Sequence, residues 1–370
     1  MKIDVSAVVP LYNKKDYLKF SVDSILNQTH KNLEVLIVDD CSTDGSLELC
    51  RELYGHDERV RIIQQPNNMG PGAARNRGIN EARGKYMLFV DSDDEILPDT
   101  MSKLLDVAEK YSADIIHNTQ FVYPLPDEDG NIPLELLSDG VQYFFNDIED
   151  DTYTKYTQVT LLSDDMASRF ENWKHRRLNW SVCSKMFRRD FLVENGIYFS
   201  DMKFAEDMIF CFECLFKSKN YVIVPGGNYV YRVTGSSLTR GKKTSSYIIK
   251  ALKAQIAAVH NMRKILGEVP FFVQNKQKAI SALERVLDDL ELGYIRPSFQ
   301  AIGEETLRSD NLIHEFMREN FGDNAPYIEF LFYELHKNYE PVLDYTEQSA
   351  DIEVWKAIAK SLREKEQNQQ

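Results

Sequence analysis

Three aspartates follow a short apolar run at residues 91–94, where the chain reads Asp91-Ser92-Asp93-Asp94. The preceding residues 86–90 are Tyr, Met, Leu, Phe and Val, which predicts a buried strand that ends at the acids. Clustered carboxylates repel one another unless a cation or hydrogen-bond donors offset their charge, and such hard oxygen ligands favour Mg²⁺ or Mn²⁺ over Zn²⁺. Bound Mg²⁺ usually takes further ligands from water and substrate phosphates. The segment thus indicates a cation site for a phosphorylated ligand; the alternative is an acidic turn that caps a helix opened by Pro98.

Strands and helices alternate over the residues that must position these acids. The apolar runs predict strands over residues 5–9, 33–38, 60–63, 86–90 and 114–117. Helical spacing between the first two strands is set by Leu18, Val22, Ile25 and Leu26. Further helices are expected over residues 44–53, 72–82 and 98–111. This alternation predicts an α/β fold, in which a mostly parallel sheet is covered by helices on both faces.

The first four expected strands all end in polar residues. These ends are residues 10–13, residues 39–42, residues 64–70 and the aspartates of residues 91–94. Ligands bind beyond the carboxyl ends of the strands in such sheets. Because four separate strand ends agree, the ligand site is expected at this edge of the sheet.

The composition limits the classes of partner. A chain of 370 residues is long enough for two domains, and its net charge of -14 argues against nucleic-acid binding through a general positive field. An anionic ligand must therefore be met by a local feature. No run approaches the roughly 20 apolar residues that span a bilayer, and the first residues lead into a strand rather than a signal peptide. We therefore expect a cytoplasmic protein.

The five cysteines do not form the pattern of a disulfide framework. Cys211 and Cys214 have the spacing of a metal or redox pair, but they fall in the helical run of residues 205–217 without a second pair. We interpret them as part of a buried helix face.

The remainder of the chain divides into two regions. Residues 123–175 form an acidic insertion with little periodicity, which we interpret either as a loop over the ligand edge or as a plain surface loop. Long amphipathic segments at residues 247–266 and 273–292 predict a helical module over residues 241–370, after a first domain of residues 1–240.

Several motifs occur in order along residues 3–240. They are VVPLYN at residues 8–13, VDDCSTDGS at 38–46, NMGPGAARN at 68–76, FVDSDD at 89–94, the pair Glu206-Asp207, and Tyr231-Arg232 with Ser236-Ser237. Together they resemble the inverting glycosyltransferases of family 2, which have the GT-A fold and use nucleotide-diphosphate sugars. The helical C-terminal third lies outside the resemblance.

The resemblance implies a set of donor-binding residues. They are Pro10, Tyr12, Asn13, Asp39, Arg75, Asp91, Ser92, Arg232 and Ser236. Asp39 would accept a hydrogen bond from the uracil ring. Arg75 would meet the base or the phosphates, although a helix arginine is ordinarily solvated. Asp91 and Asp93 would hold Mn²⁺ or Mg²⁺, which neutralises the diphosphate and stabilises it as a leaving group.

The resemblance also implies a general base, Asp207. Its apolar neighbours, Phe204 and residues 208–210, would raise its pKa, which suits a base that deprotonates an acceptor hydroxyl. The alternative is an exposed helix acid. Glu206 would orient its neighbours or contact the acceptor.

The acceptor side is marked by fewer residues. Trp180 and Lys185 resemble an acceptor wall, and burial of Trp180 in the core is the alternative. Asp94 is assigned either to positioning the acceptor or to support behind the other acids. Many relatives carry a histidine metal ligand two residues after the arginine, where this chain has Thr234, so the expected ligand set is smaller.

The favoured interpretation is transfer of a hexose or an N-acetylhexosamine from a UDP-sugar to a glycan or glycolipid acceptor in bacterial polysaccharide synthesis. One alternative is a non-catalytic carbohydrate-binding or scaffolding subunit. Another is a sugar nucleotidyltransferase, whose glycine-rich basic loop is poorly matched by residues 10–14. For the C-terminal helices we favour packing and homodimer formation over peripheral membrane contact, because the region is not predominantly basic.

Overall fold

The computed structural model describes residues 2–124, 136–137, 143–145, 156–162, 165–202, 204–232 and 243–337. The chain divides into two compact units. Unit 1 comprises residues 1–201 and 206–233, and unit 2 comprises residues 202–205 and 234–370. Most of the acidic insertion lies outside the described residues, as do Thr234, Ser236 and Ser237.

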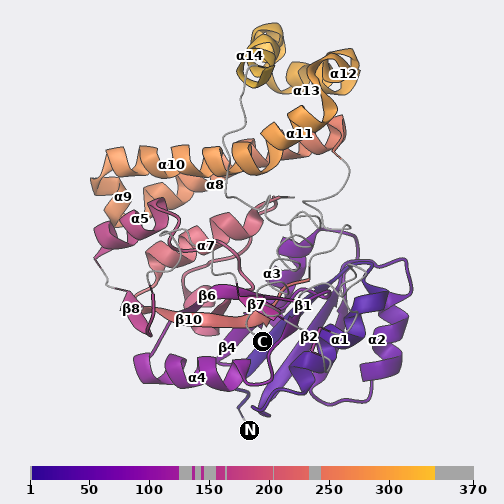
Figure 1. Ribbon diagram of the computed structural model, residues 1–370, viewed down its shortest axis with the longest axis vertical. Coiled ribbons are helices and arrows are strands. Elements are labelled where there is room, and N and C mark those ends of the chain that lie inside the picture. The colour runs from indigo at the N-terminus through magenta and orange to yellow at the C-terminus, as the bar shows by residue number, and fades with distance from the viewer. Residues whose placement is uncertain are drawn as a thin grey trace, which may run out of the picture. The chain divides into compact units, whose positions relative to one another are not determined.

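Unit 1 is built on one mixed sheet (Figure 1). Its strand order is β3 (Val60–Gln64), β2 (Leu33–Asp39), β1 (Val5–Leu11), β4 (Tyr86–Phe89), β9 (Lys185–Arg188), β6 (Ile115–Pro124), β10 (Tyr221–Val230) and β5 (Glu95–Ile96). Strand β7 (Tyr143–Phe145) pairs with β6, and β8 (Thr160–Leu162) pairs with β10. The first four strands in this order are parallel, and β9 runs antiparallel between β4 and β6. The expected mostly parallel sheet is confirmed.

Helices cover this sheet and follow the expected segments closely. They are α1 (Lys15–Leu26), α2 (Ser46–Tyr54), α3 (Pro71–Glu81), α4 (Thr100–Tyr111), α5 (Met166–Lys174), α6 (Arg189–Glu194) and α7 (Glu206–Lys217). Strands β6 and β10 lie between α4 on one side and α7 on the other (Figure 1). The four apolar residues that predicted α1 are buried, and β1 and β2 are buried along their whole length. The hydrophobic periodicity therefore predicts the packing faces as well as the helices and strands.

Helix α3 lies directly against β1. A Cβ atom added at Gly78 would lie 2.3 Å from Cγ1 of Val8, so only glycine permits this approach of the helix to the strand. The helix begins after Gly70, whose φ of 93° is in the region that favours glycine. Its buried face carries Arg75 toward the carboxyl ends of the strands.

The segment after the aspartates differs from the expectation. Residues 95–96 form the short strand β5, which pairs antiparallel with the end of β10, and the next helix begins at Thr100 rather than at Pro98. Strand β6 is also longer than expected. The pairing of Ile96 with Tyr229 brings the end of β10 against the aspartate turn.

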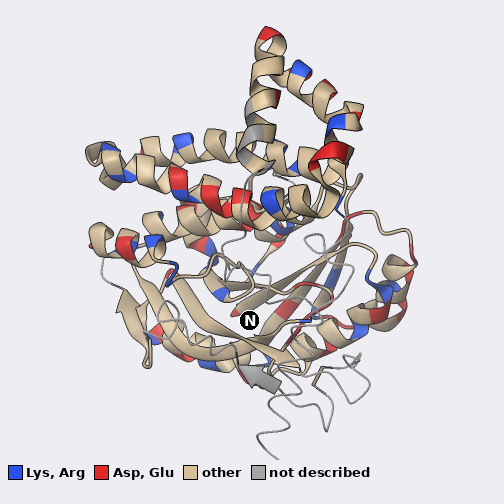
Figure 2. Ribbon diagram, turned by 45° about the horizontal axis from the view of Figure 1, so that its top comes forward, with Lys and Arg blue, Asp and Glu red and all other residues tan. Residues whose placement is uncertain are grey.

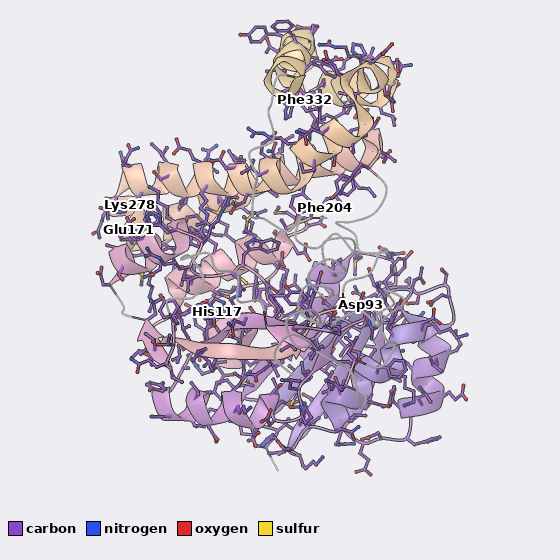
Figure 3. The ribbon with its side chains drawn as sticks, in the orientation of Figure 1. Asp93, His117, Glu171, Phe204, Lys278 and Phe332 are labelled. Atoms are coloured by element: carbon purple, nitrogen blue, oxygen red, sulfur yellow. The ribbon has the colours of Figure 1, made fainter. Side chains whose placement is uncertain are left out.

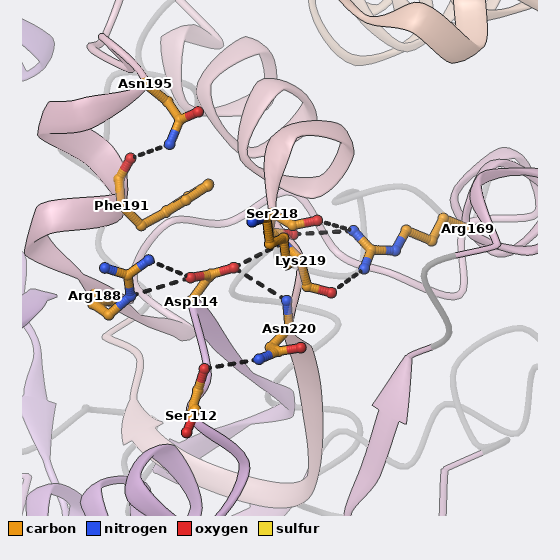
Figure 4. Close-up of polar contacts among 9 residues, drawn as sticks. All are labelled: Ser112, Asp114, Arg169, Arg188, Phe191, Asn195, Ser218, Lys219 and Asn220. Carbon is orange, nitrogen blue, oxygen red and sulfur yellow. Dashed lines mark hydrogen bonds and ion pairs between the residues drawn. The ribbon is translucent and has the colours of Figure 1, made fainter.

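Buried charges hold the turn between α7 and β10 at the opposite edge of the sheet (Figure 4). The carboxylate of Asp114 accepts hydrogen bonds from the Arg188 side chain and from the backbone N–H groups of residues 219 and 220. The Arg169 guanidinium donates to the carbonyl oxygens of Ser218 and Lys219. These groups are satisfied within the fold and serve its structure.

Unit 2 is helical over the described residues. It contains α8 (Ser245–Glu268), α9 (Pro270–Gln274), α10 (Lys276–Leu290), the π-helical turn Glu291–Ile295, α11 (Arg296–Ile302), α12 (Glu304–Ser309), α13 (Asn311–Phe321), the 3₁₀ turn Gly322–Asn324 and α14 (Ala325–Lys337). Phe204 packs against Tyr247 and Tyr294 in its core, with ring centroids 5.0 and 5.5 Å apart. Figure 2 shows both acidic and basic residues along these helices. No helix among the described residues is long and apolar enough to cross a membrane.

All five cysteines are described and none forms a disulfide. Cys211 and Cys214 are buried on α7, which confirms the interpretation of that pair as part of a buried helix face.

Candidate functional site

The ends of β1 and β2 form the first part of the site. The backbone N–H group of Asn13 donates to the Ser42 hydroxyl at 3.1 Å, and the N–H group of Thr43 donates to Asn13 Oδ1 at 2.7 Å. These two hydrogen bonds tie the two strand ends together. Asn13 has a φ of 52°, in the left-handed region that asparagine tolerates. The Tyr12 ring beside it is 46% exposed. This edge therefore presents an aromatic ring on a rigid turn.

Asp39 is fully buried at the end of β2. Its Oδ1 atom accepts a hydrogen bond from the Ser42 N–H group at 3.2 Å, whereas Oδ2 has no hydrogen-bond partner among the described residues. A buried carboxylate oxygen without a donor is costly in free energy. The arrangement fits one ligand N–H group.

Asp40, the next residue, has a structural role that the sequence analysis did not assign. Its carboxylate accepts hydrogen bonds from the N–H groups of Met69 and Gly70 at 2.8 and 2.7 Å. The Gln65 amide donates to it at 3.1 Å. Asp40 thus holds the loop that leads into α3.

The three aspartates after β4 each have a different partner. Asp91 Oδ1 accepts from Arg75 Nη2 at 2.9 Å, and Asp93 Oδ2, labelled in Figure 3, lies 2.6 Å from Lys14 Nζ. The side chains of these two acids are 33% and 18% exposed. Asp94 is buried, and its carboxylate accepts hydrogen bonds from backbone and side-chain donors on β10 and just beyond it. Burial and then the charges of Asp93 and Asp91 raise the pKa of Asp94 well above its usual range.

Arg75 is buried between two carboxylates. Its Nη1 atom donates to Glu206 at 2.8 Å, its Nη2 atom donates to Asp91, and its guanidinium lies 5.4 Å from the Phe199 ring centroid. Burial alone lowers the pKa of Arg75, but the charges of Asp91 and Glu206 outweigh it and raise that pKa above its ordinary value. The alternative of a solvated helix arginine is wrong, and contact with the nucleotide stays a prediction.

Arg232 brings a second buried guanidinium to the aspartate turn. Its Nε atom donates to the Asp93 carbonyl oxygen at 2.9 Å, and its Nη2 atom lies 3.4 Å from Glu95 Oε1. The guanidinium carbon lies 4.9 Å from the centroid of the Tyr17 ring, in the range of a cation–π contact. Lys14 and Arg232 thus supply the positive charge that the acidic chain lacks overall.

Asp207 lies in the first turn of α7. Its Oδ1 atom accepts a hydrogen bond from the Met208 N–H group at 3.1 Å, and the preceding Ala205 has a φ of 54°. The charge of Asp207 also acts on Arg75, which Glu206 contacts directly. The start of α7 is thereby linked to the donor-side acids, and the role of Asp207 as a base stays a prediction.

Lys185 is buried away from solvent. Its ammonium donates to the Asn179 and Ser181 carbonyl oxygens at 2.9 and 2.7 Å and to Asn179 Oδ1 at 3.0 Å, and burial lowers its pKa. This geometry matches a structural cation, and Trp180 beside these residues is half-buried. Acceptor roles for Lys185 and Trp180 stay predictions.

The donor set of the aspartate turn fits one kind of metal ion. Among the described residues, no group of three His, Cys, Asp or Glu side chains is placed to hold a metal. Asp91 and Asp93 supply two partly exposed carboxylates. Mg²⁺ is usually bound by one or two carboxylates and completes its shell with water and substrate phosphates. The residues therefore fit Mg²⁺ or Mn²⁺ together with a diphosphate.

Besides Asp40, the sequence analysis also missed Lys14 and Tyr229 at this edge. Lys14 directly follows the motif at residues 8–13, and this position at a strand end was its only signal. Tyr229 lies inside a β strand, and the pairing of β10 with β5 brings its hydroxyl group to the aspartate turn, so no local sequence signal marked it.

Comparison with known proteins places these features in a family. The profile described as "Glycosyl transferase family 2" matches residues 6–190. The uncharacterized glycosyltransferase EpsJ of Bacillus subtilis is 29% identical over 236 residues, which are 64% of this chain and 62% of EpsJ. The chain thus spans less than two thirds of the length of that relative.

Solved structures show the same fold. The structure of S. aureus TarS residues 1–349 in complex with UDP-GlcNAc has a TM-score of 0.58 and 18% identity, covering 98% of this chain and 92% of that one. The mannosyltransferase PcManGT from Pyrobaculum calidifontis in complex with GDP-Man and Mn²⁺ has a TM-score of 0.51 and 15% identity, covering 98% and 85%. These likenesses support the expected GT-A fold.

Proposed function

Because this chain belongs to glycosyl transferase family 2, we propose that it transfers a hexose or an N-acetylhexosamine from a UDP-sugar to a glycan hydroxyl group with inversion. The observation that carries the proposal is one oxygen of the buried Asp39 at the carboxyl end of β2, which has no hydrogen-bond partner among the described residues.

The oxygen Oδ2 of Asp39 favours uracil over cytosine and guanine. Uracil offers one ring N–H group, at N3, whereas cytosine has no N–H group there and guanine offers two adjacent donors. Because Ser42 already occupies Oδ1, only Oδ2 remains to accept a hydrogen bond. The exposed Tyr12 ring lies on the neighbouring strand end, where a base can stack. The UDP-GlcNAc bound to TarS agrees with this choice.

The acids and cations of the aspartate turn suit a sugar diphosphate. Asp91 and Asp93 would hold Mn²⁺ or Mg²⁺, and the bound ion would neutralise charge on the departing UDP. Lys14 and Arg232 lie beside the same acids and add positive charge where the diphosphate would lie. Pro10, at the end of β1, and Asn13 and Ser92 are further proposed donor contacts, as is Ser236, which lies outside the described residues.

Asp207 is the proposed base. Inversion requires a base on the face of the sugar opposite the leaving group, where it accepts the proton of the attacking hydroxyl, and a carboxylate can serve as that base. The position of Asp207 in the first turn of α7, linked through Glu206 and Arg75 to Asp91, supports this assignment.

Two wider assignments rest on the sequence and on relatives. The acceptor is proposed to be a glycan or a glycolipid of a bacterial polysaccharide pathway. Residues 1–240 are proposed to carry the reaction, and residues 241–370 are proposed to serve packing and homodimer formation. The cytoplasmic location, and peripheral association with a membrane, stay predictions.

The test is UDP release from a panel of UDP-sugars with Mn²⁺ or Mg²⁺. Wild type is compared with Asp93→Ala, Asp207→Asn and the control Asp190→Ala, whose carboxylate is 65% exposed on α6. Metal-dependent release from one donor, lost in Asp93→Ala and sharply reduced in Asp207→Asn but unchanged in the control, supports the proposal.

Two other results favour the alternatives. UDP binding without metal dependence and without hydrolysis of any UDP-sugar favours a non-catalytic binding subunit. Release of pyrophosphate from UTP and a sugar phosphate favours a sugar nucleotidyltransferase.

A further inference from the structure

The hydroxyl group of Tyr229 bridges two residues of the aspartate turn. Tyr229 lies in β10 and is 2% exposed. Its oxygen accepts a hydrogen bond from the Asp91 N–H group at 3.0 Å, and its proton is donated to Asp94 Oδ2 at 2.7 Å. One phenol therefore fixes the first and the last residue of the segment 91–94.

The other oxygen of Asp94 extends the bridge. Asp94 Oδ1 accepts a hydrogen bond from the Arg232 N–H group at 2.7 Å, and the Arg232 side chain returns to the Asp93 carbonyl oxygen at 2.9 Å. Asp94 thus uses both carboxylate oxygens on partners within the fold. The hydrogen bonds join residues 91–94 to residues 229–232 in a closed network, which we name the tyrosine clamp: Tyr229, Asp91, Asp94 and Arg232.

We propose that Tyr229 is a positioning residue, which holds the aspartate turn in the shape that directs the Asp91 and Asp93 carboxylates toward the donor. The inference rests on the proposed function of those two acids. Without the phenol oxygen, a buried Asp94 oxygen and the Asp91 N–H group both lose a partner, and such groups are costly to leave unsatisfied. The turn would shift to satisfy them, which changes the spacing of the acids on either side of Ser92.

If Tyr229 had a purely structural role, its loss would affect UDP affinity no more than the loss of any similar buried tyrosine. Tyr54 offers a matched control. Tyr54 is also buried, and its hydroxyl lies 2.8 Å from Asp23 Oδ1 and 3.1 Å from the Lys19 carbonyl oxygen, between α2 and α1. Tyr54→Phe and Tyr229→Phe each remove one oxygen that bonds an aspartate and a backbone group. Only Tyr229 contacts the aspartate turn.

The experiment uses the full chain and two measurements on wild type, Tyr229→Phe and Tyr54→Phe. UDP binding with Mn²⁺ is measured by calorimetry, and amide hydrogen exchange is measured on the peptide that contains residues 89–97. We expect Tyr229→Phe to weaken UDP binding by about five- to tenfold, the cost of one misplaced hydrogen-bonded contact. We also expect faster exchange in residues 91–95. Tyr54→Phe should change neither quantity.

Three outcomes decide the proposal. Unchanged UDP affinity and unchanged exchange in Tyr229→Phe overturn it, as does an equal loss of affinity in both variants. If wild type binds no UDP, the proposed function fails, and the exchange comparison alone decides whether Tyr229 holds the turn.

Asp94→Asn gives a second variant in case Tyr229→Phe does not fold. An asparagine keeps an oxygen for the Arg232 N–H group, but its amide nitrogen cannot accept the phenol proton. It should reproduce the loss of UDP affinity and the faster exchange, and wild-type behaviour in both measurements overturns the proposal.

Discussion

Arg75 donates a hydrogen bond from Nη1 to Glu206 Oε1 at 2.8 Å across 131 positions of sequence. The other arm of the same guanidinium binds Asp91. One buried cation therefore connects Asp91, two residues after β4, to the first turn of α7, which also carries Asp207. Because planar guanidinium groups can bridge two carboxylates, arginine suits this position better than lysine does.

Replacing Arg75 by glutamine should damage both stability and turnover. Breaking a buried ion pair leaves uncompensated charge, which costs about 3–5 kcal/mol of unfolding free energy. Arg75→Lys should be intermediate, because one ammonium cannot hold both acids in the same geometry. Urea unfolding gives the stability, and UDP release gives the turnover of the folded fraction.

Arg61 is the matched control for this prediction. It also lies between two carboxylates, at 2.7 Å from Glu81 and 3.5 Å from Glu34, and its side chain is 25% exposed. Arg61→Gln should lose less stability and keep the turnover of folded protein. Equal losses of turnover in the two variants would contradict a special role for Arg75.

The local pattern of apolar residues predicts the helices and strands, because these depend on residues that are near neighbours in the sequence. The apolar runs and helical spacing predict β1 to β4 and α1 to α4, because each of these segments has a face whose burial is visible in a few residues. The ion pair of Arg75 with Glu206 joins distant segments, and no local signal marks it. Lys185 was expected on the acceptor side from the resemblance; its burial was not visible in the sequence, because lysine is rarely buried and the carbonyl oxygens that satisfy its ammonium are known only from the structure.

Lys14 should compete with a divalent cation for Asp93. The two side chains lie 2.6 Å apart and are 20% and 18% exposed, so the ammonium neutralises the carboxylate that we propose as a metal ligand. Lys14→Met should tighten Mn²⁺ binding to nucleotide-free protein by about two- to fivefold, the range of a partly exposed ion pair. Calorimetric titration with Mn²⁺ measures it. Lys103→Met, which removes an exposed pair with Asp99, should have no effect.

Asp39→Asn should change the base preference of the site. Asparagine has one carbonyl oxygen, which Ser42 already uses, so the amide NH₂ group would face the N3–H group of uracil. Two N–H donors would then face each other and the acceptor oxygen Oδ2 would be lost, so UDP binding should weaken by about tenfold or more.

Ligand variants sharpen this test. In wild type, UDP methylated at N3 should bind weakly, because it lacks the donor that Asp39 accepts. In Asp39→Asn the difference between UDP and the methylated compound should shrink, and CDP, whose N3 is an acceptor, should gain relative to UDP. Strong binding of the methylated compound to wild type would exclude this role of Asp39.

Two buried thiols should make stability fall in alkaline solution. Burial raises the pKa of Cys50 and of Cys211 to about 12, from an ordinary value of 9.0. Their contribution to the free energy of unfolding is present below pH 9 and is lost as the pH rises toward 12. Within that range the unfolded chain releases the thiol protons, whereas the folded chain keeps them. Each thiol should lower the unfolding free energy by about 1.4 kcal/mol per pH unit within that window.

Urea unfolding of wild type and Cys50→Ala at several pH values between 9 and 11 measures this slope. The variant is less stable at every pH, since alanine leaves a cavity. Its unfolding free energy should nevertheless fall less steeply with pH, because one of the two thiols no longer contributes. Parallel slopes for the two proteins would show that Cys50 ionises alike in the folded and unfolded chain.

Gly78→Ala should push α3 away from β1 and thereby disturb Arg75, one turn earlier in the helix. The new Cβ atom would lie 2.3 Å from Cγ1 of Val8, so the helix must move, at a cost of about 1–3 kcal/mol of unfolding free energy. Gly267→Ala in α8 meets nothing within 4 Å and should stabilise the fold by up to about 1 kcal/mol.

The decisive measurement is the double variant Gly78→Ala with Val8→Ala. Removing the γ carbons of Val8 makes room for the new methyl group, so the double variant should be more stable than the sum of the two single losses and should recover UDP affinity. Additive losses would mean that the clash with Val8 does not set the distance between α3 and β1.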